Sequence, residues 1–331
     1  MYIVWLKFGV CAGIIFFAGK NIAKYADLIA LKSGISRLWI GVILVAAATS
    51  LPELFTGITS AGLMQAPNLA VGNVLGANSY NLLNIAILDL INPGAPILSV
   101  VSSGQLLTAA LTLIPIILVT MAIFLSENGV SIWNVGNVSL LTIAIFIFYC
   151  VSTRVIYIFE KRKSSPKDVT DPEGLKRAWI SFFMAAALII VSGIWLAYIG
   201  KEMANTLNLN ESFVGSLFLG LATTLPEITV SIAAIMIGAR EIAVANMLGS
   251  NLFNTAILFI DDTVYRSGPI LENVNPVNIY QAQTVMAMTV VIILAIAVKS
   301  KKRFFKVSWY IPILFIIFLM GAFFNFYMRV K

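Results

Sequence analysis

Two near-identical stretches decide the fold of this chain: Ala-Thr-Ser-Leu-Pro-Glu at residues 48–53 and Ala-Thr-Thr-Leu-Pro-Glu at residues 222–227. Each stretch lies inside a long apolar run and ends on a glutamate. An acidic residue in the middle of an apolar membrane segment is costly, so it marks a path for an ion or a polar substrate. Two such residues in matched surroundings indicate an internal repeat that carries a function.

A second pair of stretches follows the first. They read Gly-Asn-Val-Leu-Gly-Ala-Asn-Ser-Tyr-Asn at residues 72–81 and Ala-Asn-Met-Leu-Gly-Ser-Asn-Leu-Phe-Asn at residues 245–254. In each stretch three positions recur every four residues, which places them on one helix face. These positions are Asn73, Ala77, Asn81, Asn246, Ser250 and Asn254. The interval from Gly41 to Gly215 equals that from Glu53 to Glu227, so the two halves share one pattern.

The composition is that of a membrane protein. The chain is 60% hydrophobic and 11% charged, with a mean hydropathy of +0.94, whereas a soluble domain carries about 25% charged residues. The chain contains no histidine, which excludes histidine metal ligands, proton relays and catalysis. Cys11 and Cys150 both lie in apolar runs, so we expect free packing residues and no disulfide.

We expect ten membrane-spanning helices, because a bilayer requires about 20 mostly apolar residues per helix. The expected spans are 3–29, 36–64, 67–91, 103–126, 132–158, 176–203, 211–238, 241–262, 280–299 and 305–328. The first and sixth carry glycine and polar residues, so we expect them to lie at the membrane interface or to pack obliquely. We expect no cleavable signal peptide in front of the first span.

The basic residues predict the orientation of these spans. Most of the 22 lysines and arginines fall between spans one and two, five and six, seven and eight, or nine and ten. The positive-inside rule places this end in the cytoplasm, so both termini are predicted outside the cell membrane. The basic residues at the cytoplasmic end of the spans account for the net charge of +7. The charge therefore implies neither a nucleic acid nor a protein partner.

A charged segment at 161–175, with Pro166 and Pro172, divides the chain into residues 1–160 and 176–331. Each part holds five expected spans, and because five is odd the second part enters the membrane in the opposite orientation. We therefore expect an all-α membrane protein with ten transmembrane helices, arranged as two inverted-topology repeats of five joined by a cytoplasmic linker. The two glutamates would then face each other near the midplane.

The residues around the glutamates favour an oxygen-lined cation site. Pro52 and Pro226 stand directly before them, and a proline inside a helix kinks it and frees the carbonyl four residues earlier. Unwound backbone at membrane depth is tolerated where it lines a cavity or is buried in protein. Freed carbonyls, serine and threonine hydroxyls and two carboxylates suit hard cations such as Ca²⁺ and Na⁺.

Other polar residues are expected to serve packing. Asparagines in membrane helices commonly hydrogen-bond to neighbouring helices, and small residues let two helices approach closely. We assign the first role to Asn73, Asn78, Asn84 and Asn251, and the second to Gly72, Gly76 and Gly249. Three aspartates near helix ends are expected to be solvated or to cap helices. They are Asp89, Asp261 and Asp262.

The paired stretches resemble the two alpha repeats of sodium/calcium exchangers of the prokaryotic type, within the cation/calcium antiporter superfamily. The resemblance spans the chain and is sharpest at residues 41–88 and 215–258. It implies a ten-helix fold in which spans two, three, seven and eight form the ion-binding core, while spans one and six slide across it. It also implies an antiporter of Na⁺ and Ca²⁺ by alternating access, which is not an enzyme and needs no cofactor.

The same resemblance implies a metal site in which Glu53 and Glu227 ligate Ca²⁺ and share Na⁺. Hydroxyls, two backbone carbonyls and two amides complete it. The implied residues are Ala46, Thr49, Ser50, Glu53, Asn81, Gly220, Thr223, Thr224, Glu227, Ser250 and Asn254. The chain departs from the family pattern at Ala77, which usually carries a hydroxyl, and at Asn254, where some relatives carry aspartate.

Three other functions fit parts of the pattern. An antiporter of H⁺ and Ca²⁺ or another divalent cation would use the same glutamates to carry protons, but such relatives usually show Gly-Asn-x-x-Glu. A cation channel could build a filter from broken helices, but an inverted repeat with a closed midplane site favours a carrier. An intramembrane hydrolase is disfavoured because the chain has no histidine and no nucleophile motif.

Overall fold

The computed structural model describes residues 2–33, 46–92, 94–130, 133–161, 172–236, 238, 240–304 and 307–328. In this part of the chain nine helices are long and apolar enough to cross a membrane. They correspond to nine of the ten expected spans. The remaining one, at 36–64, begins among residues 34–45, which lie outside the described residues together with Gly41.

Long helices build most of the bundle. They are α1 (Tyr2–Ser33), α5 (Pro67–Ile91), α7 (Ser103–Glu127), α8 (Leu140–Lys161), α9 (Pro172–Thr206), α13 (Arg240–Val264), α14 (Val277–Val298) and α15 (Tyr310–Tyr327). Shorter elements join or interrupt them. They are α3 (Ala46–Thr49), α4 (Leu51–Ile58), the π-helix η2 (Thr59–Leu63), α6 (Ile97–Val100), α10 (Glu211–Phe213), the π-helix η3 (Val214–Leu219), α11 (Gly220–Thr223), α12 (Leu225–Met236) and the 3₁₀-helix η4 (Ile270–Glu272).

Two helices begin later than predicted, because a short antiparallel hairpin precedes each of them. The paired strands are β1 (Asn134–Val135) with β2 (Val138–Ser139), and β3 (Arg303–Phe304) with β4 (Val307–Ser308). The expected spans 132–158 and 305–328 were therefore wrong at their first residues. Gly136 reverses the first hairpin with a φ of 64°, and Lys299 ends α14 with a left-handed φ of 49°.

The helices that carry the two glutamates are broken where the prolines predict. The first break lies at Ser50 between α3 and α4, and the second at Thr224 between α11 and α12. Pro52 and Pro226 take the second position of the following helix, where a missing N–H costs little. Backbone hydrogen bonding continues up to each break, since Ser50 N donates to Ala46 O at 3.1 Å and Thr224 N donates to Gly220 O at 3.3 Å.

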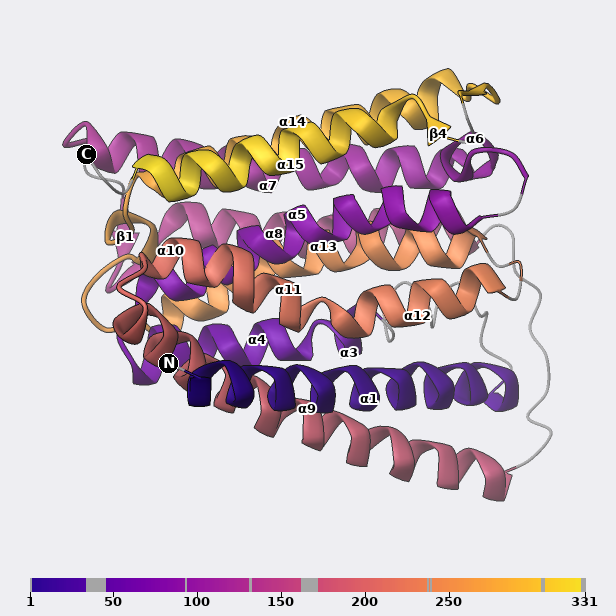
Figure 1. Cartoon of the computed structure of the whole chain (residues 1–331), viewed down its shortest axis with the longest axis horizontal. Helices are drawn as coiled ribbons and strands as arrows, with labels where there is room; N and C mark the ends of the chain where they lie inside the picture. The colour runs from indigo at the N-terminus through magenta and orange to yellow at the C-terminus, as the bar shows by residue number, and fades with distance from the viewer. Residues whose placement is uncertain are drawn as a thin grey trace.

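The bundle has a layered arrangement (Figure 1). The helices α1 and α9 pack against each other along one side, and α14 packs against α7 and α15 on the opposite side. The broken helices, α5 and α13 lie between these layers, and both termini lie at one end of the bundle. The four elements that hold the conspicuous sequence motifs are thus enclosed by the rest of the chain.

Glycines allow the backbones of the two halves to touch in this middle layer. A Cβ added at Gly76 of α5 would lie 2.2 Å from Ser216 O, and one added at Gly72 would lie 2.7 Å from Ser212 O. From the other side, a Cβ at Gly220 would lie 2.9 Å from Ala77 N. The close approach predicted for Gly72 and Gly76 is confirmed, and it fixes α5 against α10 and η3, the elements that precede the second break.

Candidate functional site

The two helix breaks place the glutamates in equivalent positions. Glu53 lies in the first turn of α4 and Glu227 in the first turn of α12, and neither has any exposed surface. The first backbone N–H groups of a helix carry partial positive charge, which favours a carboxylate at this end. The proline-induced restart of each helix therefore supports a carboxylate deep inside the bundle.

Each glutamate lies beside hydroxyl groups from the other half of the chain. Ser50 Oγ donates a hydrogen bond to Glu227 Oε1 at 3.0 Å, and Thr49 also lies close to that carboxylate. Thr223 lies beside the carboxylate of Glu53. The structure thus brings five of the sequence-predicted site residues together across the two halves.

Several polar atoms in this region have no hydrogen-bond partner among the described residues. They are both carboxylate oxygens of Glu53, one of Glu227, the amide oxygens of Asn81 and Asn254, and the hydroxyl of Ser250. All of these side chains are fully buried. A buried charge is normally paired or coordinates a metal, because leaving it alone costs several kcal/mol. These oxygens are therefore available as ligands of a cation.

The remaining predicted ligands take up intrahelical hydrogen bonds. The carbonyl oxygen of Ala46 accepts from Ser50 N and, at 3.3 Å, from Thr49 Oγ1. The carbonyl oxygen of Gly220 accepts from Thr224 Oγ1 at 2.9 Å. Thr224 therefore turns back on its own helix, unlike its counterpart Ser50. A carbonyl oxygen has two lone pairs, and Gly220 O also accepts from Thr224 N at 3.3 Å. A cation ligated by either carbonyl would therefore replace one of the hydroxyl bonds.

Asparagines hold the glutamate-bearing helices in place. For Asn73 this is the predicted packing role, whereas no such role was predicted for Asn246. Asn73 Nδ2 donates to Glu53 O at 3.5 Å, and Asn246 Nδ2 donates to Glu227 O at 3.2 Å. Thr223 Oγ1 also donates to Asn73 Oδ1 at 3.3 Å. The same bond in both halves fixes the backbone at each glutamate, so α5 and α13 act as supports for α4 and α12.

A second group of asparagines joins α5 to α13. Asn254 Nδ2 donates to Asn78 Oδ1 at 3.1 Å, and Asn251 Nδ2 donates to Asn78 O at 3.2 Å. The packing role predicted for Asn78 and Asn251 is confirmed. Because its nitrogen is engaged by Asn78, Asn254 presents its oxygen as the free group.

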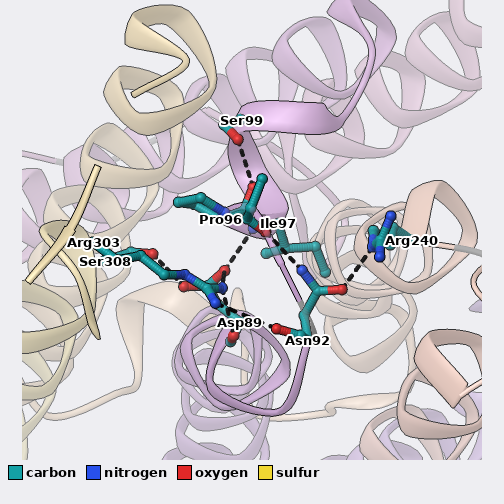
Figure 2. A network of polar contacts seen from close by, with 9 residues as sticks. Asp89, Asn92, Pro96, Ile97, Ser99, Arg240, Arg303 and Ser308 are labelled. Carbon is teal, nitrogen blue, oxygen red and sulfur yellow. Dashed lines mark hydrogen bonds and ion pairs between the residues drawn. The ribbon is translucent and has the colours of Figure 1, made fainter. Parts of the chain in front are cut away.

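Asp89 is a buried capping residue, so the alternative expectation of a solvated side chain was wrong. Its carboxylate accepts from Ile97 N at 2.5 Å, Arg303 Nη2 at 2.9 Å and Ser308 Oγ at 2.5 Å (Figure 2). The chain folds back over the end of α5, so these donors replace water. Arg240 Nε donates to Asn92 Oδ1 at 2.6 Å in the same network, which ties the start of α13 to the end of α5.

Asp262 plays the same role at the end of α13. It accepts from Ile270 N at 2.6 Å and from Ser139 N at 2.8 Å, as well as from Thr142 Oγ1. Each aspartate accepts a bond from the backbone N–H eight residues further on. Each also accepts a bond from a serine of the opposite half, which directly precedes or lies just before a helix that follows a hairpin. Sequence reasoning missed this, although the interval between Asp89 and Asp262 equals that between Asn81 and Asn254.

The described residues contain no group of three or more histidine, cysteine, aspartate or glutamate side chains close enough to hold a metal ion. A cation site here must draw on neutral oxygens as well as the two carboxylates. Cys11 and Cys150 are both free. Cys11 is buried, as expected for a packing residue, whereas Cys150 is exposed, so the packing role expected for it was wrong.

Comparison with known proteins identifies relatives along most of the chain. The family described as "Sodium/calcium exchanger protein" matches residues 3–155 and 177–328. The inner membrane protein YrbG of Escherichia coli (strain K12) is 24% identical over 258 residues, which cover 74% of this chain and 74% of that protein. The sodium/calcium exchanger MaX1 of Methanosarcina acetivorans is 22% identical over 264 residues, covering 71% of this chain and 75% of MaX1.

The fold is also that of a solved exchanger. A structure of the sodium-calcium exchanger NCX_Mj, soaked with 2.5 mM Na⁺ and 1 mM Sr²⁺, aligns with a TM-score of 0.66 and 18% identity. The alignment covers 97% of this chain and 99% of the other. At this level of identity the likeness establishes the fold and not the transported ions.

Proposed function

Because this chain belongs to the sodium/calcium exchanger protein family, we propose that it is a secondary-active antiporter that exchanges Na⁺ for Ca²⁺ across the cell membrane. The protein is a multi-pass membrane transporter and not an enzyme. The observation that carries the proposal is the pair of fully buried glutamates, with unpaired oxygens and hydroxyls from the opposite half beside them.

The proposed architecture is ten transmembrane helices in two inverted repeats, residues 1–160 and 176–331, with 161–175 as a cytoplasmic linker and both termini outside. Matched contacts support it. Asn73 and Asn246 donate to the carbonyls of Glu53 and Glu227, and an inverted repeat places a shared substrate site between its halves.

The proposed ion site consists of side-chain oxygens from both halves and two backbone carbonyls. Glu53 and Glu227 bind the cation directly. The other ligands are the side chains of Thr49, Ser50, Asn81, Thr223, Thr224, Ser250 and Asn254 and the carbonyls of Ala46 and Gly220. Ca²⁺ takes six to eight oxygen ligands, and Na⁺ is also a hard cation, so a shared all-oxygen site serves both.

Charge balance couples the two ions. Two carboxylates neutralise one Ca²⁺ or two Na⁺, and a third Na⁺ would make the cycle electrogenic, exchanging about 2.3 kcal/mol per 100 mV for each net charge. Two unpaired carboxylates are expensive to carry through an apolar barrier. The site therefore reorients only when it is loaded with one ion species or the other, which couples the downhill movement of one ion to the uphill movement of the other.

The test is ⁴⁵Ca²⁺ uptake into proteoliposomes loaded with Na⁺, with K⁺-loaded vesicles and vesicles under a pH gradient alone as controls. We expect uptake only with internal Na⁺, and none in Glu53→Gln. The matched control is Glu127→Gln, which neutralises an exposed glutamate at the end of α7 and leaves uptake unchanged. Uptake under a pH gradient alone identifies the alternative, an H⁺/Ca²⁺ antiporter, and uptake without any counter-ion identifies a channel.

A further inference from the structure

Asp261 is a buried carboxylate that the central site does not use. It lies on α13, seven residues beyond Asn254, and has no exposed surface. Seven residues make two helical turns, about 10 Å along the axis, and return to the same helix face. Neither carboxylate oxygen has a hydrogen-bond partner among the described residues.

The carboxylate lies flat against the backbone of α4. A Cβ added at Gly57, one turn beyond Glu53, would lie 2.5 Å and 2.6 Å from the two oxygens of Asp261. A Cβ added at Gly62 would lie 3.2 Å from Val264. Residues 57–62 therefore run alongside the last turn of α13, and glycine at position 57 leaves the space that the carboxylate takes.

Ser60 lies between Gly57 and Gly62 in the sequence and adds a second unpaired oxygen. Its side chain is fully buried, and its Oγ has no hydrogen-bond partner in the described part of the chain. It belongs to the π-helix η2, which packs against α13. Such π segments occur frequently at functional sites, because the wider turn re-aims side chains.

The capping role at the end of α13 belongs to the neighbouring Asp262 and not to Asp261. Asp262 accepts the hydrogen bonds that close the end of α13, from Ile270 N and Ser139 N. Its counterpart in the first half is Asp89, so the counterpart of Asp261 is Leu88. The extra carboxylate therefore exists in one half alone. It lies in the last turn of α13, and this helix ends at the end of the bundle where both termini lie (Figure 1).

We propose that Asp261 and Ser60, packed over the backbone of Gly57, form a second binding site for one monovalent hard cation of the Na⁺ class. One carboxylate neutralises one monovalent charge, and carboxylate and hydroxyl oxygens are hard ligands. Glu53, one turn before Gly57, and Asp262, saturated by its donors, are the acidic neighbours. That the site lies on the transport route rests on the proposed function, but its occupation by Na⁺ does not.

The experiment is equilibrium ²²Na⁺ binding to the purified protein in detergent, in a Glu53→Gln/Glu227→Gln background that removes both central carboxylates. We expect one saturable Na⁺ component to remain, and to disappear when Asp261→Asn is added. Absence of saturable binding in the background, or binding that Asp261→Asn leaves intact, overturns the proposal. Failure of the proposed exchange is seen separately, as Na⁺-independent ⁴⁵Ca²⁺ uptake by the unaltered protein.

A milder variant keeps the test decisive if the triple variant does not fold. Ser60→Ala in the otherwise unaltered chain removes one ligand oxygen, and we expect at least tenfold weaker binding of one Na⁺ with Ca²⁺ binding unchanged. Ser103→Ala, at an exposed serine of α7, is the matched control. Equal Na⁺ binding by Ser60→Ala and Ser103→Ala contradicts the assignment.

Discussion

Substitution of Gly19 by alanine tests how the outer pair of helices moves over the core. Gly19 lies on α1 where this helix crosses the second break, and a Cβ there would lie 2.3 Å from Pro226 Cβ and 2.7 Å from its Cα. Carbon atoms prefer about 3.5–4.0 Å, so α1 must move by more than 1 Å against a rigid ring. Overpacking of this kind costs about 1–3 kcal/mol.

The cost falls on the described conformation, because the contact belongs to it. If α1 and α9 slide over the core during transport, a penalty of about 1–3 kcal/mol shifts the conformational equilibrium about 5- to 150-fold. We expect Gly19→Ala to slow Na⁺-dependent ⁴⁵Ca²⁺ uptake by a factor in this range. The dissociation constant of Ca²⁺ at equilibrium should change by no more than the shift in the conformational equilibrium. The assay is initial uptake into proteoliposomes at matched protein content.

The same helix supplies the controls. No described atom lies within 4 Å of a Cβ added at Gly9 or Gly13, so their alanine variants should transport normally. Gly193 on α9 is the counterpart of Gly19, because the two are separated by the same interval as the two glutamates. A Cβ added at Gly193 would lie 3.0 Å from Pro52 O. Gly193→Ala should therefore have a smaller effect than Gly19→Ala. Equal uptake by Gly13→Ala and Gly19→Ala would refute the reasoning.

Three further predictions follow from the contacts of the core. Ser50→Ala should raise the half-saturating Ca²⁺ concentration of uptake more than Thr224→Ala, because only Ser50 donates to Glu227; equal effects would contradict this. Asn246→Ala should lower turnover at saturating Ca²⁺ by loosening Glu227, and unchanged turnover would count against that role. Asp89→Asn should lower the thermal unfolding midpoint in detergent, because removing one partner of a buried ion pair costs about 3–5 kcal/mol; an unchanged midpoint excludes that role.

The sequence was sufficient for the broken helices and for the two glutamates. Proline lacks a backbone N–H and disfavours a helix interior, which accounts for the breaks at Ser50 and Thr224 beside Pro52 and Pro226. The effect depends on its surroundings, since Pro115 lies inside the unbroken α7. The packing role of Asn73 also followed from the tendency of asparagines in membrane helices to bond to a neighbouring helix, but its partner, the carbonyl of Glu53, did not. Features of this kind depend on one residue type and on its near neighbours in the sequence.

The features that the sequence did not predict depend on segments far apart in the chain. The hairpins before α8 and α15 interrupt apolar runs, because the chain turns back over the ends of α13 and α5. Asp89 was assigned to solvent or a cap because hydropathy cannot show that Arg303 and Ser308 cover it. Asp261 was grouped with Asp262 for the same reason, since adjacent residues differ only in the helix face they occupy.

The central claim is that Na⁺ and Ca²⁺ exchange through one site that contains both glutamates. The most direct measurement follows ⁴⁵Ca²⁺ uptake and ²²Na⁺ efflux together in the same proteoliposomes, for the unaltered protein and for Glu227→Gln. The account predicts that the two fluxes start together, keep a constant ratio as the gradients are varied, and are lost together in the variant. Ca²⁺ uptake that proceeds without Na⁺ efflux, or that Glu227→Gln leaves intact, would contradict it.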